Sequence, residues 1–254
     1  MADWVPHRVT FTRSEDTYNV SATLINMVLA KKIMRLFSER GYAHRVLCGR
    51  VYGVMRNRLG MAAPMLTEDR RVLEQIIFPH YANNSRIHTV LFVGCDSYTA
   101  HYGRRYFAGH NYWTLDPDAT RRRFAAKQHV TARLQDVGRY FPHAFFDLIV
   151  FNGVYGWGLD SVQDCEAALS QCHRCLGDGG HLIIGWNDLP ERDPAPLSEV
   201  SSLSRFSKYA FPAFGGWQYL TQTVYRHTYR FYQKTERGCT AGCPDLDRET
   251  MPQV

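Results

Sequence analysis

The feature that most constrains the fold is a series of short apolar runs, rich in β-branched residues, that starts near residue 88 and alternates with segments of helical character. Continuous apolar runs of this length are typical of strands buried on both faces of a sheet. Buried strands that alternate with helices predict βαβ units, a parallel sheet and right-handed crossovers. The predicted strands are 89–94, 112–116, 129–133, 146–151 and 181–186.

The segments around these strands complete the prediction of a fold. Helices are expected at 121–127 and 161–176, and the alternating aromatic segments 217–223 and 228–234 predict an antiparallel edge hairpin. Before the first strand, apolar residues at helical spacing predict helices at 21–39 and from Thr67 to Pro79. We therefore expect an α/β, Rossmann-like, doubly wound and mostly parallel seven-stranded sheet. Its expected parts are an N-terminal helical cap or lid (1–87), the sheet domain (88–234) and a flexible tail (235–254).

Composition is that of an ordinary globular protein. The chain has 254 residues, 45% hydrophobic and 21% charged, which argues against disordered, collagen-like and coiled-coil classes. The N-terminus does not resemble a signal peptide, and the most apolar stretch, 22–30, is too short to cross a bilayer. We therefore expect a cytoplasmic protein with no membrane partner.

The cysteines predict neither a disulfide framework nor a metal site. Seven cysteines are an odd and scattered set. Cys172 with Cys175, and Cys239 with Cys243, have zinc-like local spacings. However, Cys172 follows Cys165 at helical spacing, which favours burial as small apolar side chains, and no metal is expected.

Chemistry in an open parallel sheet is expected outside the carboxyl ends of the strands. Gly94 ends the first strand, where a glycine permits a tight turn and close approach of a ligand to the backbone. Asp116 ends the next strand about 20 residues later, a spacing at which an acid accepts hydrogen bonds from a ribose diol. By the same logic Asp136, after the third strand, is placed to meet an adenine amino group.

The order of these features resembles the class I S-adenosylmethionine-dependent methyltransferases over residues 88–234. The resemblance rests on the segments 90–98, 115–116, 135–137, 146–152 and 176–185. It implies that S-adenosyl-L-methionine is the cofactor and that 88–234 is the catalytic domain. The implied cofactor-binding residues are Gly94, Cys95 and Asp96 beside the cofactor, Asp116 and Pro117 at the ribose, Asp136 and Val137 at the adenine, and Asn152 and Gly153 flanking the methionine part.

The first loop departs from the family pattern of an acid followed by three spaced glycines. Phe92 stands in place of the acid, Asp96 in place of the second glycine and Tyr98 in place of the third. Asp96 offers a replacement acceptor for the methionine end, and the alternative is a loop that has lost cofactor binding. The missing glycines also count against a nicotinamide dehydrogenase, whose pyrophosphate needs close backbone approach at several positions.

A base is needed only if the methyl acceptor carries a proton that must leave, as a hydroxyl or a protonated amine does. The candidate catalytic residues are His101, Tyr98 and Tyr155. His101 is alternatively a histidine without a catalytic role. Tyr155 and Trp157 either line an acceptor pocket or pack beneath the N-terminal helices.

The sequence predicts methyl transfer to a heteroatom of a small-molecule acceptor. One alternative is methylation of an RNA or DNA base, suggested by the charge of +6, the basic stretches 45–58 and 121–123, and a faint echo of an Asn-Pro-Pro-Tyr motif at 152–155. Another is a catalytically silent partner subunit. The edge hairpin offers a surface for a homodimer. Which element is methylated stays open.

Overall fold

The computed structural model describes residues 67–189 and 196–235. These residues belong to one compact unit, Arg56–Val254. The expected helix 21–39, the basic stretch 45–58, and Cys239 and Cys243 in the tail lie outside the described residues. Most of the expected 1–87 cap lies outside them too, so the predicted domain boundaries stay predictions. Within the described part of the chain, no helix is long and apolar enough to cross a membrane.

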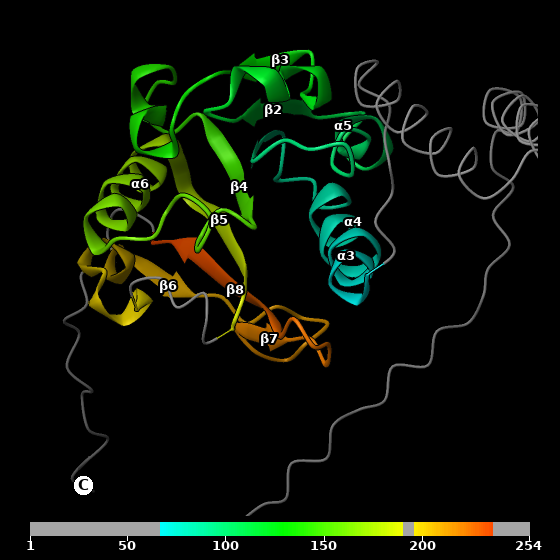
Figure 1. The fold of residues 1–254 in the computed structure, drawn as a ribbon, viewed down its shortest axis with the longest axis vertical. Helices are drawn as coiled ribbons and strands as arrows, with labels where there is room; N and C mark the ends of the chain where they lie inside the picture. Colours follow the sequence, from blue (N-terminus) through cyan, green and yellow to red (C-terminus); the bar gives the residue numbers. More distant parts are fainter. Residues whose placement is uncertain (1–66, 190–195, 236–254) are drawn as a thin grey trace, which may run out of the picture. The chain divides into compact units, whose positions relative to one another are not determined.

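A mixed sheet forms the centre of the molecule, with the strand order β3-β2-β1-β4-β5-β8-β6 (Figure 1). The strands from β3 to β5 pair in parallel, and β8 joins β5 antiparallel. This is the α/β, mostly parallel architecture that the sequence predicts. The strands are β1 (Thr89–Val93), β2 (Asn111–Leu115), β3 (Gln128–Val130), β4 (Phe146–Asn152), β5 (Leu176–Asn187), β6 (Phe206–Lys208), β7 (Gln218–Leu220) and β8 (His227–Lys234).

The C-terminal strands differ from the predicted edge hairpin. β7 and β8 do pair antiparallel, but β8 lies inside the sheet, with β5 on its other side. The outer side of β8 is shared by two short strands, because β7 pairs with its first half and β6 with its second half. The described sheet therefore has eight strands in place of the expected seven. The additional strand, β6, is three residues long and mostly exposed, which leaves little apolar pattern to detect.

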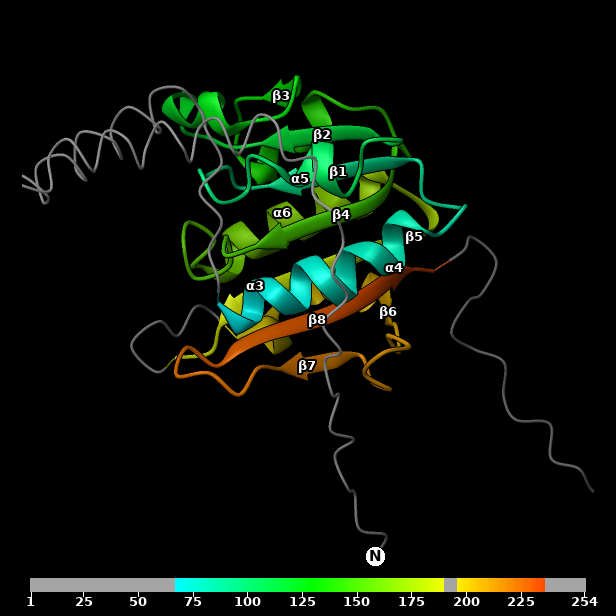
Figure 2. The ribbon, with the colours of Figure 1, turned by 90° about the vertical axis from the view of Figure 1, so that its right-hand side faces the viewer.

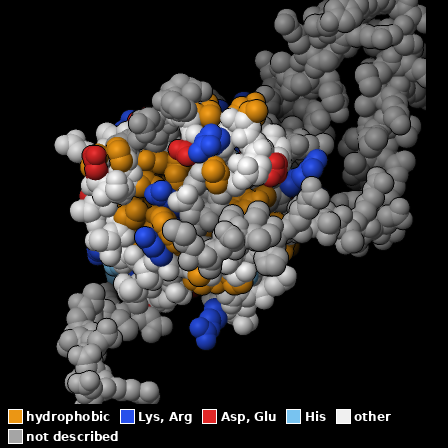
Figure 3. All heavy atoms as spheres, turned by 90° about the horizontal axis from the view of Figure 1, so that it is seen from below, with side chains coloured by type: hydrophobic (Ala, Val, Ile, Leu, Met, Phe, Trp, Pro, Cys, Tyr) orange, Lys and Arg blue, Asp and Glu red, His pale blue; other side chains and the backbone are white. Residues whose placement is uncertain are grey.

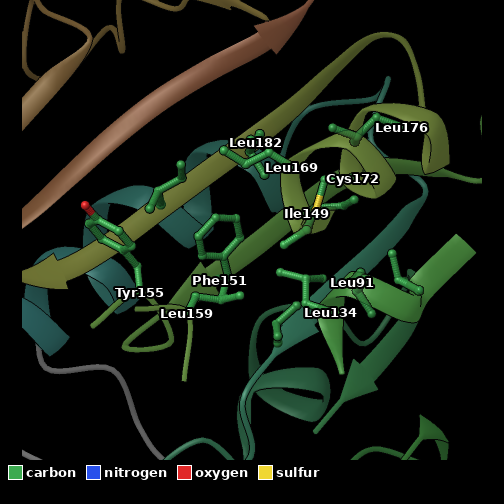
Figure 4. Close-up of a cluster of buried hydrophobic side chains, with 14 of the residues drawn as sticks. Leu91, Leu134, Ile149, Phe151, Tyr155, Leu159, Leu169, Cys172, Leu176 and Leu182 are labelled. Carbon is green, nitrogen blue, oxygen red and sulfur yellow. The ribbon is translucent and has the colours of Figure 1, made fainter. Parts of the chain in front are cut away.

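Helices cover both faces of the sheet (Figures 1 and 2). α6 (Val162–Cys175) lies on one face, and the helical segment formed by α3 (Glu68–Val72), a π-helix η1 (Leu73–Ile77) and α4 (Phe78–Ala82) lies on the other. Side chains of β1 alternate between the two cores: Leu91 packs with the α6 side and Phe92 with the α4 side. Figure 4 shows the α6 side, where Leu169 and Cys172 pack against side chains of β4 and β5.

The segment from α3 to α4 continues three residues beyond Pro79, where the helix is predicted to end. The π-helix η1 directly precedes α4, in which Pro79 is the second residue. A proline in a regular helix lacks an N–H and collides with the preceding turn, and the wider π turn relieves both problems.

The remaining helical segments are short. Residues 121–127 are predicted as a helix, but the structure has a 3-10 helix, η2 (Ala119–Phe124). Three further 3-10 helices are η3 (Leu134–Arg139), η5 (Leu197–Glu199) and η6 (Ser201–Arg205), and one short α-helix is α5 (Tyr102–Arg105). The third strand, β3, ends at Val130 and is shorter than predicted.

Candidate active site

A cavity of about 870 Å³ lies at the carboxyl ends of β1, β2, β4 and β5. This volume is near the upper end of the range for small-molecule sites. The start of β8 and the first turn of α3 also contribute to its lining. Residues that reach the cavity from these elements include Asp69, Arg70, Gly94, Asp116, Asn152, Asn187 and His227.

The first loop turns sharply at the end of β1. Gly94 has a φ of +89°, a conformation that disfavours any residue with a side chain. A Cβ at this position would also stand 3.3 Å from Val154 Cγ2. Phe92, at the position of the family's acid, has its side chain in the aromatic core on the α4 side and not in the cavity. The predicted role of Gly94 in bringing backbone close to a ligand therefore fits its geometry.

Asp116 connects the loops after β1 and β2. One carboxylate oxygen accepts the Cys95 N–H at 2.6 Å, and the other accepts the Asp118 N–H at 2.8 Å. A carboxylate has about four lone-pair sites, so both oxygens retain one for a ligand. Asp116 is 8% exposed and lines the cavity, as does Pro117. This arrangement fits a ribose diol. Burial, and then the charge of Asp116, raise the pKa of the Cys95 thiol to about 12, so this cysteine carries no reactive thiolate near neutral pH.

Asp96 is held by an arginine from η2. Arg121 Nη1 forms an ion pair with the Asp96 carboxylate and also donates to the Cys95 carbonyl oxygen at 3.3 Å. Burial acts to lower the pKa of Arg121, but its bonds and charges, led by Asp96, outweigh it and raise this pKa. The side chain proposed to replace the missing acid is therefore engaged by a cation.

The loop after β3 faces the cavity with residues other than those predicted. Val137 is fully buried in the core, and the Asp136 carboxylate lies 3.3 Å from Arg139. Neither lines the cavity, which Leu134 and Gln135 reach in their place. In the short 3-10 helix η3, Leu134 and Val137 share a face that packs in the core on the α6 side, and Leu134, at the start of the helix, also reaches the cavity.

The three candidate bases are not brought together. Tyr98 lines the cavity. His101 lies outside the lining, with Nε2 3.7 Å from a Glu74 carboxylate oxygen. Tyr155 is 4% exposed and packs edge-on against Trp186 in the core. Figure 4 shows the Tyr155 side chain beside that of Phe151. Tyr155 is therefore a core residue on the α6 side and does not pack beneath the described N-terminal helices α3 and α4, whereas Trp157 lines the cavity.

A buried arginine and its acidic neighbour contribute from α3. Arg70 is 6% exposed, donates from Nη1 to the Tyr102 hydroxyl at 3.1 Å, and has its guanidinium 4.4 Å from the centre of the Tyr98 ring. The Asp69 carboxylate stands 3.8 Å from Arg70 Nε. The Asp69 carbonyl oxygen accepts the Tyr229 hydroxyl at 2.8 Å, which fixes α3 to β8.

Two amides and a histidine form a polar cluster at the ends of β4, β5 and β8. His227 Nε2 lies 2.8 Å from Asn152 Oδ1, and His227 Nδ1 lies 2.7 Å from Asn187 Oδ1. His227 is 3% exposed. Burial lowers its pKa to about 4, opposed by the charge of Asp69 and aided by that of Arg70, so the ring is neutral near neutral pH.

Sequence reasoning assigned no catalytic or cofactor-binding role to Asp69, Arg70, Asn187 or His227, although Asn187 follows a predicted strand at the edge where chemistry is expected. They lie on α3 before the first strand, on β5 and on β8, and only the sheet order brings them to one cavity. One signal was present: Gly185 interrupts an apolar strand, and a glycine there often marks close approach of another group. Among the described residues, no group of three or more His, Cys, Asp or Glu side chains is placed to hold a metal ion.

Comparison with known proteins gives one family and many solved structures. Residues 91–184 match the family described as a methyltransferase domain. No curated protein matches. Similar solved structures include the N-methyltransferase NodS from Bradyrhizobium japonicum WM9 (13% identity, 66% of this chain and 97% of that chain, TM-score 0.49). Another is a TehB-like SAM-dependent methyltransferase from Corynebacterium glutamicum (17% identity, 77% and 100% of the chains, TM-score 0.48).

Proposed function

We propose that this chain, whose residues 91–184 match a methyltransferase domain, is a class I S-adenosylmethionine-dependent methyltransferase that methylates a heteroatom of a small-molecule acceptor. The cofactor, when bound, supplies an already activated methyl group. The enzyme has to align the acceptor with that group and exclude water.

The observation that carries the proposal is the burial of the polar groups at one end of the cavity. The predicted cofactor residues Gly94 and Asp116 lie at the ends of β1 and β2. A second set lies on α3, β4, β5 and β8, and it includes Asn152, which the family resemblance placed beside the methionine part of the cofactor. In this second set, Arg70, Asn152 and His227 are each less than a tenth exposed. We refer to this region as the acceptor end. Buried hydrogen-bonding groups suit a compact polar molecule that fits inside the cavity.

Nucleic acid is the less favoured acceptor. Of the basic run 121–123, Arg121 is paired with Asp96, and its Nε lies 3.7 Å from an Asp118 carboxylate oxygen, so its charge is compensated. On the face shown in Figure 3, Lys and Arg side chains are separated by hydrophobic and neutral surface. A nucleic-acid site requires a continuous basic surface that neutralises several phosphates. A cytoplasmic location and a homodimer stay predictions.

The proposal is tested by following a labelled methyl group. The protein is incubated with methyl-labelled S-adenosylmethionine and a cell extract divided by ultrafiltration into small molecules, protein and RNA. We expect a labelled small molecule that chromatography resolves from S-adenosylmethionine, and no labelled product in any fraction with Asp116→Ala. Label that enters RNA or protein alone would overturn the small-molecule proposal and leave the methyltransferase assignment intact.

A further inference from the structure

The polar cluster of Asn152, Asn187 and His227 exists because the strand between two of its members lacks a side chain. Asn152 is on β4 and His227 on β8, and β5 runs between these two strands. Asn152 pairs with Gly185 of β5 in the parallel register. A Cβ at Gly185 would lie 1.9 Å from Asn152 Oδ1 and 3.0 Å from His227 Nε2. The glycine therefore leaves the space through which Asn152 and His227 make their hydrogen bond.

Both nitrogens of His227 are occupied by amides, so the ring has no free lone pair for a proton of the substrate. A neutral imidazole has one N–H and therefore donates to one amide and accepts from the other. His227 is thus placed to fix how the two amides are turned, and it is not placed to act as a general base.

Asn152 has a polar atom left over. It is 6% exposed, and its Nδ2 has no hydrogen-bond partner. If the ring donated to Asn152, both N–H bonds of this buried amide would lack a partner. If the amide is turned so that Oδ1 and Nδ2 exchange places, Asn152 donates one N–H to the ring, and the carbonyl oxygen and the second N–H are left without a partner. A buried carbonyl without a partner is tolerated better than a buried N–H. The second arrangement, in which His227 donates to Asn187, is therefore favoured.

We propose that Asn152 accepts a hydrogen bond from an N–H or O–H group of the methyl acceptor, and that His227 is the positioning residue that turns the Asn152 carbonyl toward the cavity. This inference rests on the proposed function and narrows its substrate class to amines and hydroxyl compounds. An acceptor hydrogen held by Asn152 leaves the lone pair of the same atom free to face the methyl group. A thioether has no such hydrogen.

The surrounding charges suit this class. Asp69 and Arg70 stand beside His227 from α3, and their opposite charges are 3.8 Å apart. Asp69 and Arg70 therefore leave no net charge at the acceptor end. Hydrogen bonds to the polar cluster, and not ionic attraction, select the methyl acceptor. Tyr229 follows His227 by two residues on β8, so both side chains face the same side of the strand. The centre of the Tyr229 ring lies 4.7 Å from that of the His227 ring and supports it.

Two cofactor analogues test the inference without a known acceptor. In sinefungin, a carbon that bears an amino group replaces the sulfur of S-adenosylhomocysteine, so its N–H bonds stand where the methyl group is transferred. The ratio of the two dissociation constants, measured by calorimetry, isolates this group. We expect wild type to bind sinefungin about tenfold more tightly than S-adenosylhomocysteine, as one charge-assisted hydrogen bond allows.

The variants separate positioning from general destabilisation. A Gln amide reaches the level of the ring Nε2, and an Asn amide only that of Nδ1. We therefore expect His227→Gln to keep the sinefungin preference and His227→Asn to lose it, with S-adenosylhomocysteine binding unchanged. Gly185→Ala should also lose the preference. Gly177→Ala is its matched control in the same strand, because a Cβ there has ordinary contacts of 3.7 Å or more. Thermal unfolding reports whether each variant is folded.

Each outcome decides between the proposals. An equal preference in wild type, His227→Gln and His227→Asn would overturn the role of His227 and leave the methyltransferase assignment standing. A loss of S-adenosylhomocysteine binding in His227→Asn would place the cluster at the cofactor and overturn the inference as well. If wild type binds neither analogue, the proposed function fails, and the inference fails with it.

Discussion

At the scale of single residues, Asp116 has two tasks that one carboxylate can combine. It fixes two loops by accepting the N–H groups of Cys95 and Asp118, and it lines the cavity with lone pairs to spare. Loop geometry and ligand binding therefore depend on the same side chain. Measurements of ligand affinity and of the free energy of unfolding should therefore separate the two tasks.

Replacing Asp116 separates these tasks. Asp116→Ala removes every acceptor, so we expect affinity for S-adenosylhomocysteine to fall by at least about tenfold and unfolding to become easier by about 1–3 kcal/mol. Asp116→Asn keeps one carbonyl acceptor and should lose less of both. Calorimetry and urea denaturation measure the two quantities, with the exposed Glu199→Gln as control. Unchanged affinity in Asp116→Ala would remove this residue from the cofactor site.

At the scale of elements, α6 shows how a local signal fixes a boundary. Ser161 precedes the helix, and its hydroxyl accepts the Asp164 N–H at 3.1 Å while donating to the Asp164 carboxylate at 2.8 Å. We expect Ser161→Ala to reduce the free energy of unfolding by about 1 kcal/mol, the ordinary cost of losing such a cap. Urea denaturation would show this against the exposed Ser198→Ala. Full stability in Ser161→Ala would mean that packing alone holds the first turn of α6.

The same scale shows what could be predicted from sequence. Strands such as β1 and β4 follow from apolar runs, and Asp116 from its place after one of them. The acceptor end could not be predicted, because its contacts join distant parts of the chain: the bond from the Tyr229 hydroxyl to the Asp69 carbonyl spans 160 residues. Periodicity reports which face of an element is buried, and it does not report which elements become neighbours.

At the scale of the whole molecule, the fold buries or half-buries neutral histidines in several places. Burial is the leading cause that lowers the pKa of His173, His181 and His227 to about 4. They lie on α6, on β5 and at the cavity, so the effect is not confined to one site. Because the unfolded chain protonates these rings at an ordinary pKa near 6.5, acid should favour unfolding over the interval between the two values.

His181 allows the sharpest test of this pH dependence. Its ring packs against Tyr81 and Tyr209, and Nδ1 has no hydrogen-bond partner. Between about pH 6.5 and 4 the unfolded chain binds a proton that the folded ring does not, so stability is lost as pH falls through this window. At about pH 5 the loss of unfolding free energy attributable to one such histidine is about 2 kcal/mol relative to neutral pH.

His181→Phe keeps an aromatic ring at this position without a titrating group. Its free energy of unfolding, measured in urea at both pH values, should therefore fall by about 2 kcal/mol less than that of wild type. The exposed His88→Gln serves as control. Parallel pH curves for wild type and His181→Phe would show that His181 is protonated in the folded protein, which its burial between two tyrosines argues against.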